Sequence, residues 1–304
     1  MKKRLFITGL SGFVGQHIQS RLALPDSSWE LLSAATPYDL TDAGSLVDLW
    51  PQLPDAVIHL AGQTFVPEAF RDPARTFDIN LLGTLNLLQA LKARGFQGTF
   101  LYVSSGDVYG QVGESALPIT ELQPPCPRNP YAVSKLSAEF LSLQWGMSEQ
   151  WPVLVARPFN HIGTGQKDSF VIASAARQIS RIKQGLQAPQ LEVGDIDVSR
   201  DFLDVGDVIS AYFALLEKGQ PGQVYNICSG REQSIRSLIE QLADLAEVEL
   251  QLVQDPARMR RADQRRVCGS HAKLATATGW APDITTQQSL RAILSDWEKR
   301  VRQE

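Results

Sequence analysis

The sequence contains few cysteines and histidines and no long hydrophobic run. Of its 304 residues, four are histidines and three are cysteines, which stand at Cys126, Cys228 and Cys268. The odd number and wide spacing of the cysteines exclude a disulfide framework, and neither residue type shows the spacing of a metal site. No apolar stretch reaches the roughly 18 residues of a membrane-spanning helix. We therefore expect a cytoplasmic protein with reduced thiols, no metal centre and no membrane partner.

An excess of charge of one sign is also lacking. The chain has 29 Lys and Arg residues against 33 Asp and Glu residues, which gives a net charge of -4. Because there is no broad basic field, we expect no nucleic acid partner, and an anionic small ligand would need a local cluster of basic residues. The composition, 43% hydrophobic and 20% charged, is typical of a globular protein with a large core.

Short apolar runs alternate with helical patterns over the first half of the chain. The predicted strands are residues 5–8, 30–34, 56–61, 99–105 and 153–157, and the predicted helices are 14–24, 76–93 and 131–145. Alternation of this kind indicates a parallel sheet with helices on both faces. We predict an α/β fold in which residues 1–160 form a Rossmann-type, doubly wound parallel sheet that binds a dinucleotide.

The pattern is less regular beyond residue 160. Helical stretches are expected at 170–184, 205–216 and 234–245, strands at 224–227 and 248–253, and a closing helix through Leu290, Ile293, Leu294, Trp297 and Val301. We predict that residues 161–304 form mainly a smaller C-terminal α/β lobe that binds the substrate, with some later segments returning to the first domain.

A glycine-rich turn, TGLSGFVG at residues 8–15, joins the first predicted strand to the first predicted helix. Glycines at positions 9, 12 and 15 permit a tight turn, close approach of backbone amides to a pyrophosphate, and close packing of the helix on the strand. The strand before and the helix after this turn predict a dinucleotide site. The second predicted strand ends at Ser33-Ala34-Ala35 without an acid or an arginine, and a carboxylate comes only at Asp39. NAD and NADP therefore both remain possible from the residues.

A serine, a tyrosine and a lysine are expected to meet beside this turn. Tyr131 and Lys135 lie four residues apart on one face of a predicted helix, which Asn129 and Pro130 begin. Ser105 ends a predicted strand at the carboxyl edge of the sheet, where ligands bind in such folds. An ammonium group lowers the pKa of a nearby tyrosine, whose hydroxyl then exchanges a proton with a substrate oxygen during hydride transfer. We predict these roles for Lys135 and Tyr131, with Ser105 holding the oxygen.

The motifs together resemble those of the extended short-chain dehydrogenase/reductase family. The resemblance rests on the turn at 8–15, His59-Leu60-Ala61-Gly62, Ser104-Ser105 and the Tyr131 and Lys135 pair, and it covers essentially the whole chain. Stretches at 157–161, 191–195, 200–202 and 255–263 further resemble the branch of this family that acts on GDP-hexoses. The resemblance implies NADP or NAD, in the reduced form, as hydride donor, and a homodimer.

The resemblance also implies roles for individual positions. The positions that match catalytic residues are Ser105, Tyr131 and Lys135. Those that match cofactor-binding residues are Gly9, Gly12, Phe13, Val14, Gly15, Asp39, Leu40, Leu60, Ala61, Gly62, Asn80, Tyr131 and Lys135. Those that match substrate-binding residues are Ser105, Asp107, Asn160, Val171, Arg200 and Arg260, the arginines being suited to a diphosphate.

Asp107 bears on which reaction is expected. Dehydratases of the family place a glutamate where Asp107 stands. Aspartate is one methylene shorter, and this matters because a general base must come within about 3 Å of the proton that it removes. Reduction of a ketone needs no such base, so the residues favour a reductase. The resemblance to the GDP-hexose branch then implies reduction of the C4 ketone of GDP-6-deoxy-4-keto-D-mannose to GDP-D-rhamnose. A GDP-mannose 4,6-dehydratase, another nucleotide-sugar epimerase or dehydratase, and a catalytically silent dinucleotide-binding sensor remain the alternatives.

Overall fold

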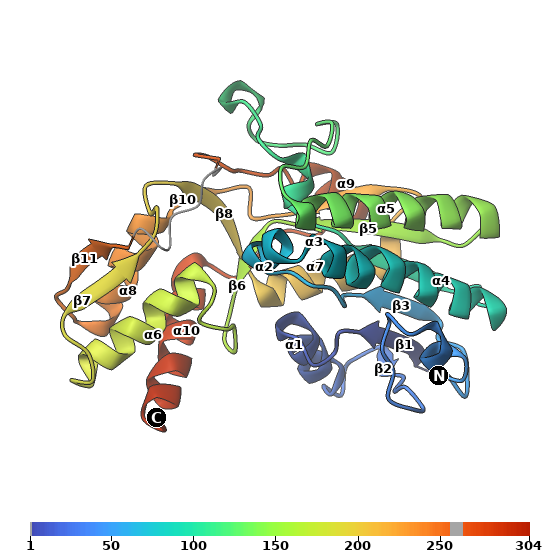
Figure 1. The fold of residues 1–304 in the computed structure, drawn as a ribbon, viewed down its shortest axis with the longest axis horizontal. Helices are drawn as coiled ribbons and strands as arrows, with labels where there is room; N and C mark the ends of the chain where they lie inside the picture. The colour runs from blue at the N-terminus through green and yellow to red at the C-terminus, as the bar shows by residue number, and fades with distance from the viewer. Residues whose placement is uncertain (1, 256–263) are drawn as a thin grey trace.

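The protein has the predicted α/β architecture, described here by a computed structural model of residues 2–255 and 264–304. A six-stranded sheet carries helices on both faces, and a second body of helices and short strands lies beside it (Figure 1). Arg260, expected to contact the substrate, lies outside the described residues. The prediction of a Rossmann-type parallel sheet is confirmed.

The central sheet is parallel throughout and runs in the order β2-β1-β3-β4-β5-β9. Its strands are β1 (Lys3–Thr8), β2 (Trp29–Leu31), β3 (Ala56–His59), β4 (Thr99–Val103), β5 (Val153–Pro158) and β9 (Val224–Ile227). The order changes direction between β1 and β3, whose last residues Thr8 and His59 are register partners. Ligands of open α/β sheets bind at such a switch point, outside the carboxyl ends of the strands.

Helices from both halves of the chain cover the two faces of the sheet. One face packs against α1 (Phe13–Leu22), α7 (Val205–Lys218) and α9 (Ala272–Thr278). The other packs against α4 (Gly83–Ala93) and α5 (Pro130–Glu149), with α2 (Val66–Arg71) and α3 (Pro73–Phe77) against α5. Since β9, α7 and α9 follow residue 160, the chain returns to the sheet after entering the second body.

The second body is built around α6 (Val171–Lys183), α8 (Ile235–Ala246) and α10 (Thr286–Val301). Its strands form two small sheets: β7 (Gln190–Val193) pairs with β11 (Gln251–Gln254), and β8 (Ser199–Asp204) lies between β6 (Asn160–Ile162) and β10 (Glu232–Ser234). Apolar residues of the three helices, including Ile179, Leu238 and Trp297, form a core separate from that of the central sheet.

Several elements differ from the sequence prediction. The helix expected over 76–93 is divided into α3, a π-helical turn η2 (Asp78–Leu82) and α4, and β2 is shorter than expected. Four strands of the second body, β6, β7, β8 and β10, were not predicted. They have three to six residues each and pair across large sequence separations, so they carry little local periodicity. Short 3-10 helices are η1 (Ala43–Leu46), η3 (Gly106–Tyr109) and η4 (Glu114–Ala116).

Candidate active site

The glycine-rich turn after β1 is packed so closely that side chains would not fit. Gly9 has a φ of +75°, and a Cβ on it would lie 2.9 Å from the backbone of Ala61. A Cβ on Gly15 would lie 2.5 Å from the Gly9 carbonyl oxygen. Gly12 begins α1 without a side chain to cap the first helical amides. Exposed backbone donors at a helix N-terminus suit the pyrophosphate of a dinucleotide, so these residues fit that cofactor.

Residues 60–62, which follow β3, lie beside the glycine-rich turn. Together they form the groove predicted to bind the cofactor. The Ala61 amide donates to the Thr8 hydroxyl at 3.1 Å, which joins the ends of β3 and β1. A Cβ on Gly62 would lie 2.9 Å from Asn80 Oδ1 and 3.9 Å from Lys135 Nζ. Lys135 Nζ therefore lies against the predicted cofactor groove.

Asn80 is a buried support below Gly62. Its Oδ1 accepts from the Gln63 amide at 2.7 Å, while its Nδ2 donates to the Gln63 carbonyl at 3.0 Å and to the Ser134 hydroxyl at 2.9 Å. These bonds connect the turn after β3 to α5, and the π-helical turn η2 carries the asparagine. Because its amide is engaged in this way, Asn80 holds the shape of the groove.

Ser105, Tyr131 and Lys135 converge at the carboxyl end of β4. Ser105 begins η3, and its hydroxyl accepts from the Asp107 amide at 3.2 Å. Asn129 caps α5 by accepting from the Ala132 amide at 2.7 Å, in the way predicted from the sequence. The first and second turns of α5 then present Tyr131 and Lys135, both buried, on one face.

The electrostatics of this group differ from the sequence prediction in one respect. Burial, followed by the charge of Asp107, raises the pKa of Tyr131, and a hydrogen bond with Ser105 opposes this only in part. Burial also lowers the pKa of Lys135 to about 7, against the opposing effect of Glu139. The expected lowering of the Tyr131 pKa by Lys135 is thus outweighed by desolvation. Tyr131 keeps its proton at neutral pH, the state needed for donation to a ketone.

Three of the positions expected to contact the substrate lie on elements of the second body. Asn160 is exposed at the start of β6, Val171 is exposed as the first residue of α6, and Arg200 lies on β8, next to β6. Phe13, in the first turn of α1, stacks on His161 with ring centroids 6.0 Å apart and planes within 2°. This contact links the phosphate turn to the strand that carries Asn160.

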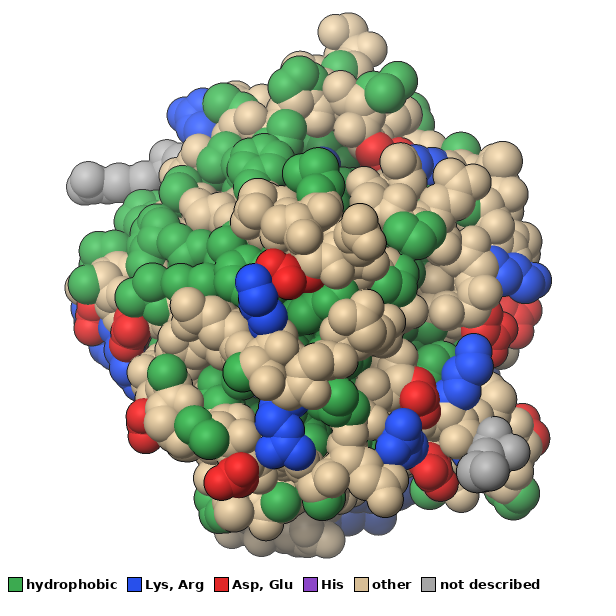
Figure 2. Space-filling view, turned by 90° about the vertical axis from the view of Figure 1, so that its right-hand side faces the viewer, with side chains coloured by type: hydrophobic (Ala, Val, Ile, Leu, Met, Phe, Trp, Pro, Cys, Tyr) green, Lys and Arg blue, Asp and Glu red, His purple; other side chains and the backbone are tan. Residues whose placement is uncertain are grey.

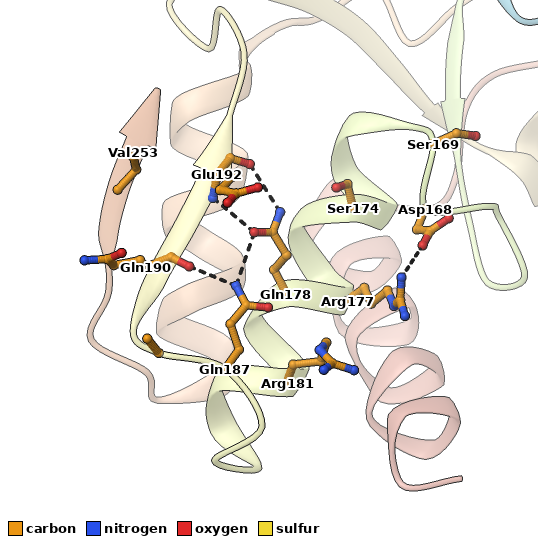
Figure 3. Close-up of a pocket in the computed structure, with 11 residues that line it drawn as sticks. Asp168, Ser169, Ser174, Arg177, Gln178, Arg181, Gln187, Gln190, Glu192 and Val253 are labelled. Atoms are coloured by element: carbon orange, nitrogen blue, oxygen red, sulfur yellow. Dashed lines mark hydrogen bonds and ion pairs between the residues drawn. The ribbon is translucent and has the colours of Figure 1, made fainter. Parts of the chain in front are cut away.

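A cavity of about 550 Å³ lies along α6, on the side that faces β7 (Figure 3). Gln178 spans it, because its Oε1 accepts from the Glu192 amide at 3.0 Å and its Nε2 donates to the Glu192 carbonyl at 3.2 Å. Arg177 donates to Asp168 at 2.6 Å at the end nearest the start of the helix. The other lining residues are Ser169, Ser174, Arg181, Gln187, Ala188, Gln190 and Val253.

Residues 2–255 and 264–304 contain neither a candidate metal centre nor a candidate membrane-spanning helix. Within these ranges no group of three or more His, Cys, Asp or Glu side chains is placed to hold a metal ion. Over the same ranges, none of the helices has both the length and the apolar character needed to cross a membrane.

Sequence reasoning missed a buried ion pair one helical turn beyond Lys135. Arg157 on β5 donates to Glu139 on α5 through Nη2 at 2.5 Å and Nε at 3.1 Å, and both side chains are buried. The available signal was the spacing of Glu139, one helical turn beyond Lys135 and two beyond Tyr131. That spacing predicts a shared face, although it does not reveal the arginine.

The glycine turn and the serine, tyrosine and lysine at one sheet edge define a dinucleotide-dependent oxidoreductase of the extended short-chain dehydrogenase/reductase class. Residues 34–293 match the family model described as GDP-mannose 4,6 dehydratase. The chain therefore belongs to the GDP-mannose 4,6 dehydratase family, and the resemblance inferred from its motifs is confirmed.

Proteins with more than one activity are similar to this chain. The chain is 74% identical over 304 residues, all of both chains, to the GDP-6-deoxy-D-mannose reductase of Pseudomonas aeruginosa PAO1. It is 28% identical to a GDP-mannose 4,6-dehydratase of Vibrio cholerae, covering 86% of this chain and 78% of that protein. The structure of RMD from P. aeruginosa complexed with NADPH has a TM-score of 0.96, with 74% identity over 98% of this chain and 100% of that one.

Proposed function

We propose that this protein reduces the C4 ketone of GDP-6-deoxy-4-keto-D-mannose to GDP-D-rhamnose, with NADPH as hydride donor. The observation that carries this proposal is the 74% identity, over the full length of both chains, to a GDP-6-deoxy-D-mannose reductase. The choice of NADPH is supported by the complex of the P. aeruginosa protein with that cofactor. The site agrees with reduction, since its buried tyrosine keeps its proton at neutral pH.

Each group of the site then has a role in binding the cofactor or in proton transfer. The bound cofactor supplies the hydride to the carbonyl carbon. The turn at residues 8–15 binds its pyrophosphate, Asp39 and Leu40 flank the adenine, and residues 60–62 line the groove. Tyr131 donates its proton to the carbonyl oxygen, which Ser105 holds by a hydrogen bond, and the Lys135 ammonium stabilises the phenolate that results.

We assign the nucleotide of the substrate to the region around the start of α6. Val171 is exposed there, and Asp168, Ser169 and Ser174 around it line the cavity along the helix. The diphosphate is then bound by Arg200 and Arg260, because a guanidinium group can donate two parallel hydrogen bonds to the oxygens of one phosphate. Asn160 and Asp107 lie on the sugar side, and the sugar C4 faces Tyr131.

The direct test is oxidation of reduced cofactor by the purified protein. With GDP-6-deoxy-4-keto-D-mannose, we expect absorbance at 340 nm to fall with NADPH and a GDP-6-deoxyhexose to form in equal amount. Release of a 4-keto sugar from GDP-mannose, without net oxidation of NADPH, would instead identify a dehydratase. Tight NADPH binding with turnover of neither substrate would identify a sensor.

We also propose that the protein is a homodimer formed through α5 and its neighbours. Val133, Phe140 and Met147 are exposed and stand seven residues apart, so they form one apolar stripe along α5. Exposed Phe70 and Leu82 lie on α2 and η2, which pack against α5. Figure 2 shows the end of the molecule that carries α4 and the end of α5, with hydrophobic side chains gathered at its upper left. A patch of this kind suits a second copy of the same surface.

Charges placed on this stripe should separate the dimer. Phe140 is 56% exposed and Met147 76% exposed, so replacing both by Glu leaves the monomer fold intact. Burying the two carboxylates should raise the dimer Kd by at least about 100-fold. Sedimentation equilibrium should then report the 33.5 kDa chain mass, where the wild type gives twice that mass. Val47→Glu, at an exposed apolar residue outside α5, is the matched control and should stay dimeric.

We propose a cytoplasmic location for the protein. All three cysteines, Cys126, Cys228 and Cys268, are free thiols. Free thiols are typical of a reducing compartment, which also supplies reduced nicotinamide cofactor.

A further inference from the structure

The ion pair between Glu139 and Arg157 lies directly behind the catalytic lysine. Lys135 and Glu139 are four residues apart on α5, and their exposed fractions are 4% and 0%. The Arg157 guanidinium makes two hydrogen bonds to Glu139 and lies over the Tyr109 ring, 4.8 Å from its centroid. The Tyr109 hydroxyl donates to Asn226 Oδ1 at 2.6 Å. The carboxylate of Glu139 is therefore held in place from β5, and the arginine is held in turn from η3 and β9.

Several groups face the Lys135 ammonium from the elements around it. From β4, the Tyr102 ring centroid lies 4.6 Å from Nζ, and from β3 comes His59, which is neutral because burial lowers its pKa to about 3. From α5 itself come the phenol of Tyr131, whose proton is retained, and the carboxylate of Glu139.

Two more charges lie one step further away. Asp107 acts on Tyr131, and Arg157 is paired with Glu139. Among the described groups that act on Lys135, Glu139 is the carboxylate whose charge raises the lysine pKa against burial. Tyr102 contributes no charge, and it contacts the ammonium through the electron-rich face of its ring.

We propose that Glu139, fixed by Arg157, is a positioning residue for the reduction, because its buried carboxylate keeps Lys135 in the ammonium form beside Tyr131. This inference rests on the proposed function. Proton donation leaves Tyr131 as a phenolate, which a charged Lys135 stabilises and a neutral Lys135 does not. Loss of the Glu139 charge lowers the Lys135 pKa further, so the ammonium disappears at a lower pH.

The test is the pH profile of kcat/KM in charge-changing and charge-keeping variants. In Glu139→Gln, we expect the alkaline limb of the profile to move to lower pH by about one unit or more. At a given pH on that limb, this shift lowers kcat/KM about tenfold. Glu139→Asp keeps the charge and should restore the limb to within about half a unit of wild type. Tyr225→Phe removes a buried hydroxyl on β9 that accepts a hydrogen bond from the Gln220 amide, without changing a charge, and its limb should not move.

A variant that folds poorly does not prevent the test. Glu139→Gln alone leaves Arg157 buried without its partner, which is destabilising. Glu139→Gln with Arg157→Gln replaces the ion pair by two amides that can bond to each other. An acid shift is again expected, smaller than in the single variant because the opposing charge of Arg157 is also removed. An unmoved limb in this folded double variant would show that the pair only ties α5 to β5, and the proposal would be wrong.

A second measurement separates this inference from the proposed function. The resemblance implies that Lys135 contacts the cofactor, and its Nζ lies beside Gly62 in the predicted groove. NADPH binding should therefore depend on pH without any sugar substrate, and fluorescence titration measures it. The loss of NADPH affinity with rising pH should begin at lower pH in Glu139→Gln than in wild type. If wild type fails to reduce the ketone but this shift is seen, the proposed function falls while the role of Glu139 stands. An identical binding profile in both proteins would overturn the role of Glu139.

Discussion

Tyr131→Phe should lower kcat for reduction by roughly 10²- to 10⁴-fold, the usual contribution of a general acid. The change removes the hydroxyl that donates the proton, while the ring keeps its place in a buried site on α5. The NADPH Kd should change by no more than about threefold, because most of the cofactor is held by the glycine turn and the segment after β3. Stopped-flow oxidation of NADPH and fluorescence titration give the two quantities separately.

A matched control comes from another buried tyrosine. Tyr225 on β9 accepts a hydrogen bond from the Gln220 amide at 3.0 Å, away from the serine, tyrosine and lysine group. Tyr225→Phe should leave kcat close to wild type. Equal turnover in Tyr131→Phe and wild type would mean that another group delivers the proton, and the assigned mechanism would be wrong.

Gly15→Ala should abolish useful cofactor binding. The added Cβ would lie 2.5 Å from the Gly9 carbonyl oxygen and 2.6 Å from Leu10 Cα, both backbone atoms that cannot turn aside as a side chain can. The phosphate turn and the start of α1 must then move apart, which removes the close backbone approach to the pyrophosphate. We expect the NADPH Kd to rise by about 100-fold or more, about 2.7 kcal/mol.

The control for this variant is another glycine whose Cβ direction is open. At Gly113 the nearest atom to an added Cβ is the Ser115 hydroxyl, at 4.0 Å. Gly113→Ala should therefore bind NADPH as wild type does, and thermal melts of both variants report whether the fold survives. Normal NADPH affinity in a folded Gly15→Ala protein would contradict the assignment of this turn to the pyrophosphate.

The sequence by itself determined the features that depend on neighbouring residues. Alternating apolar runs and helical patterns were enough to predict the parallel sheet, since strands buried on both faces are continuously apolar. The turn at residues 8–15 and the Asn129 and Pro130 start of α5 were predicted because caps and tight turns need particular residues at fixed local positions. The spacing of Tyr131 and Lys135 predicted their shared face in the same way.

Only the tertiary structure decided how those residues behave chemically. Burial reversed the expected direction of the Tyr131 pKa shift, and burial depends on the packing of the whole domain. The pairing of Glu139 with Arg157 joins α5 to β5, and the hydrogen bonds of Asn80 join η2 to the turn after β3 and to α5. Helix and strand periods determine which face a side chain occupies, but its partner across the core and its exposure to water depend on how separate elements pack together.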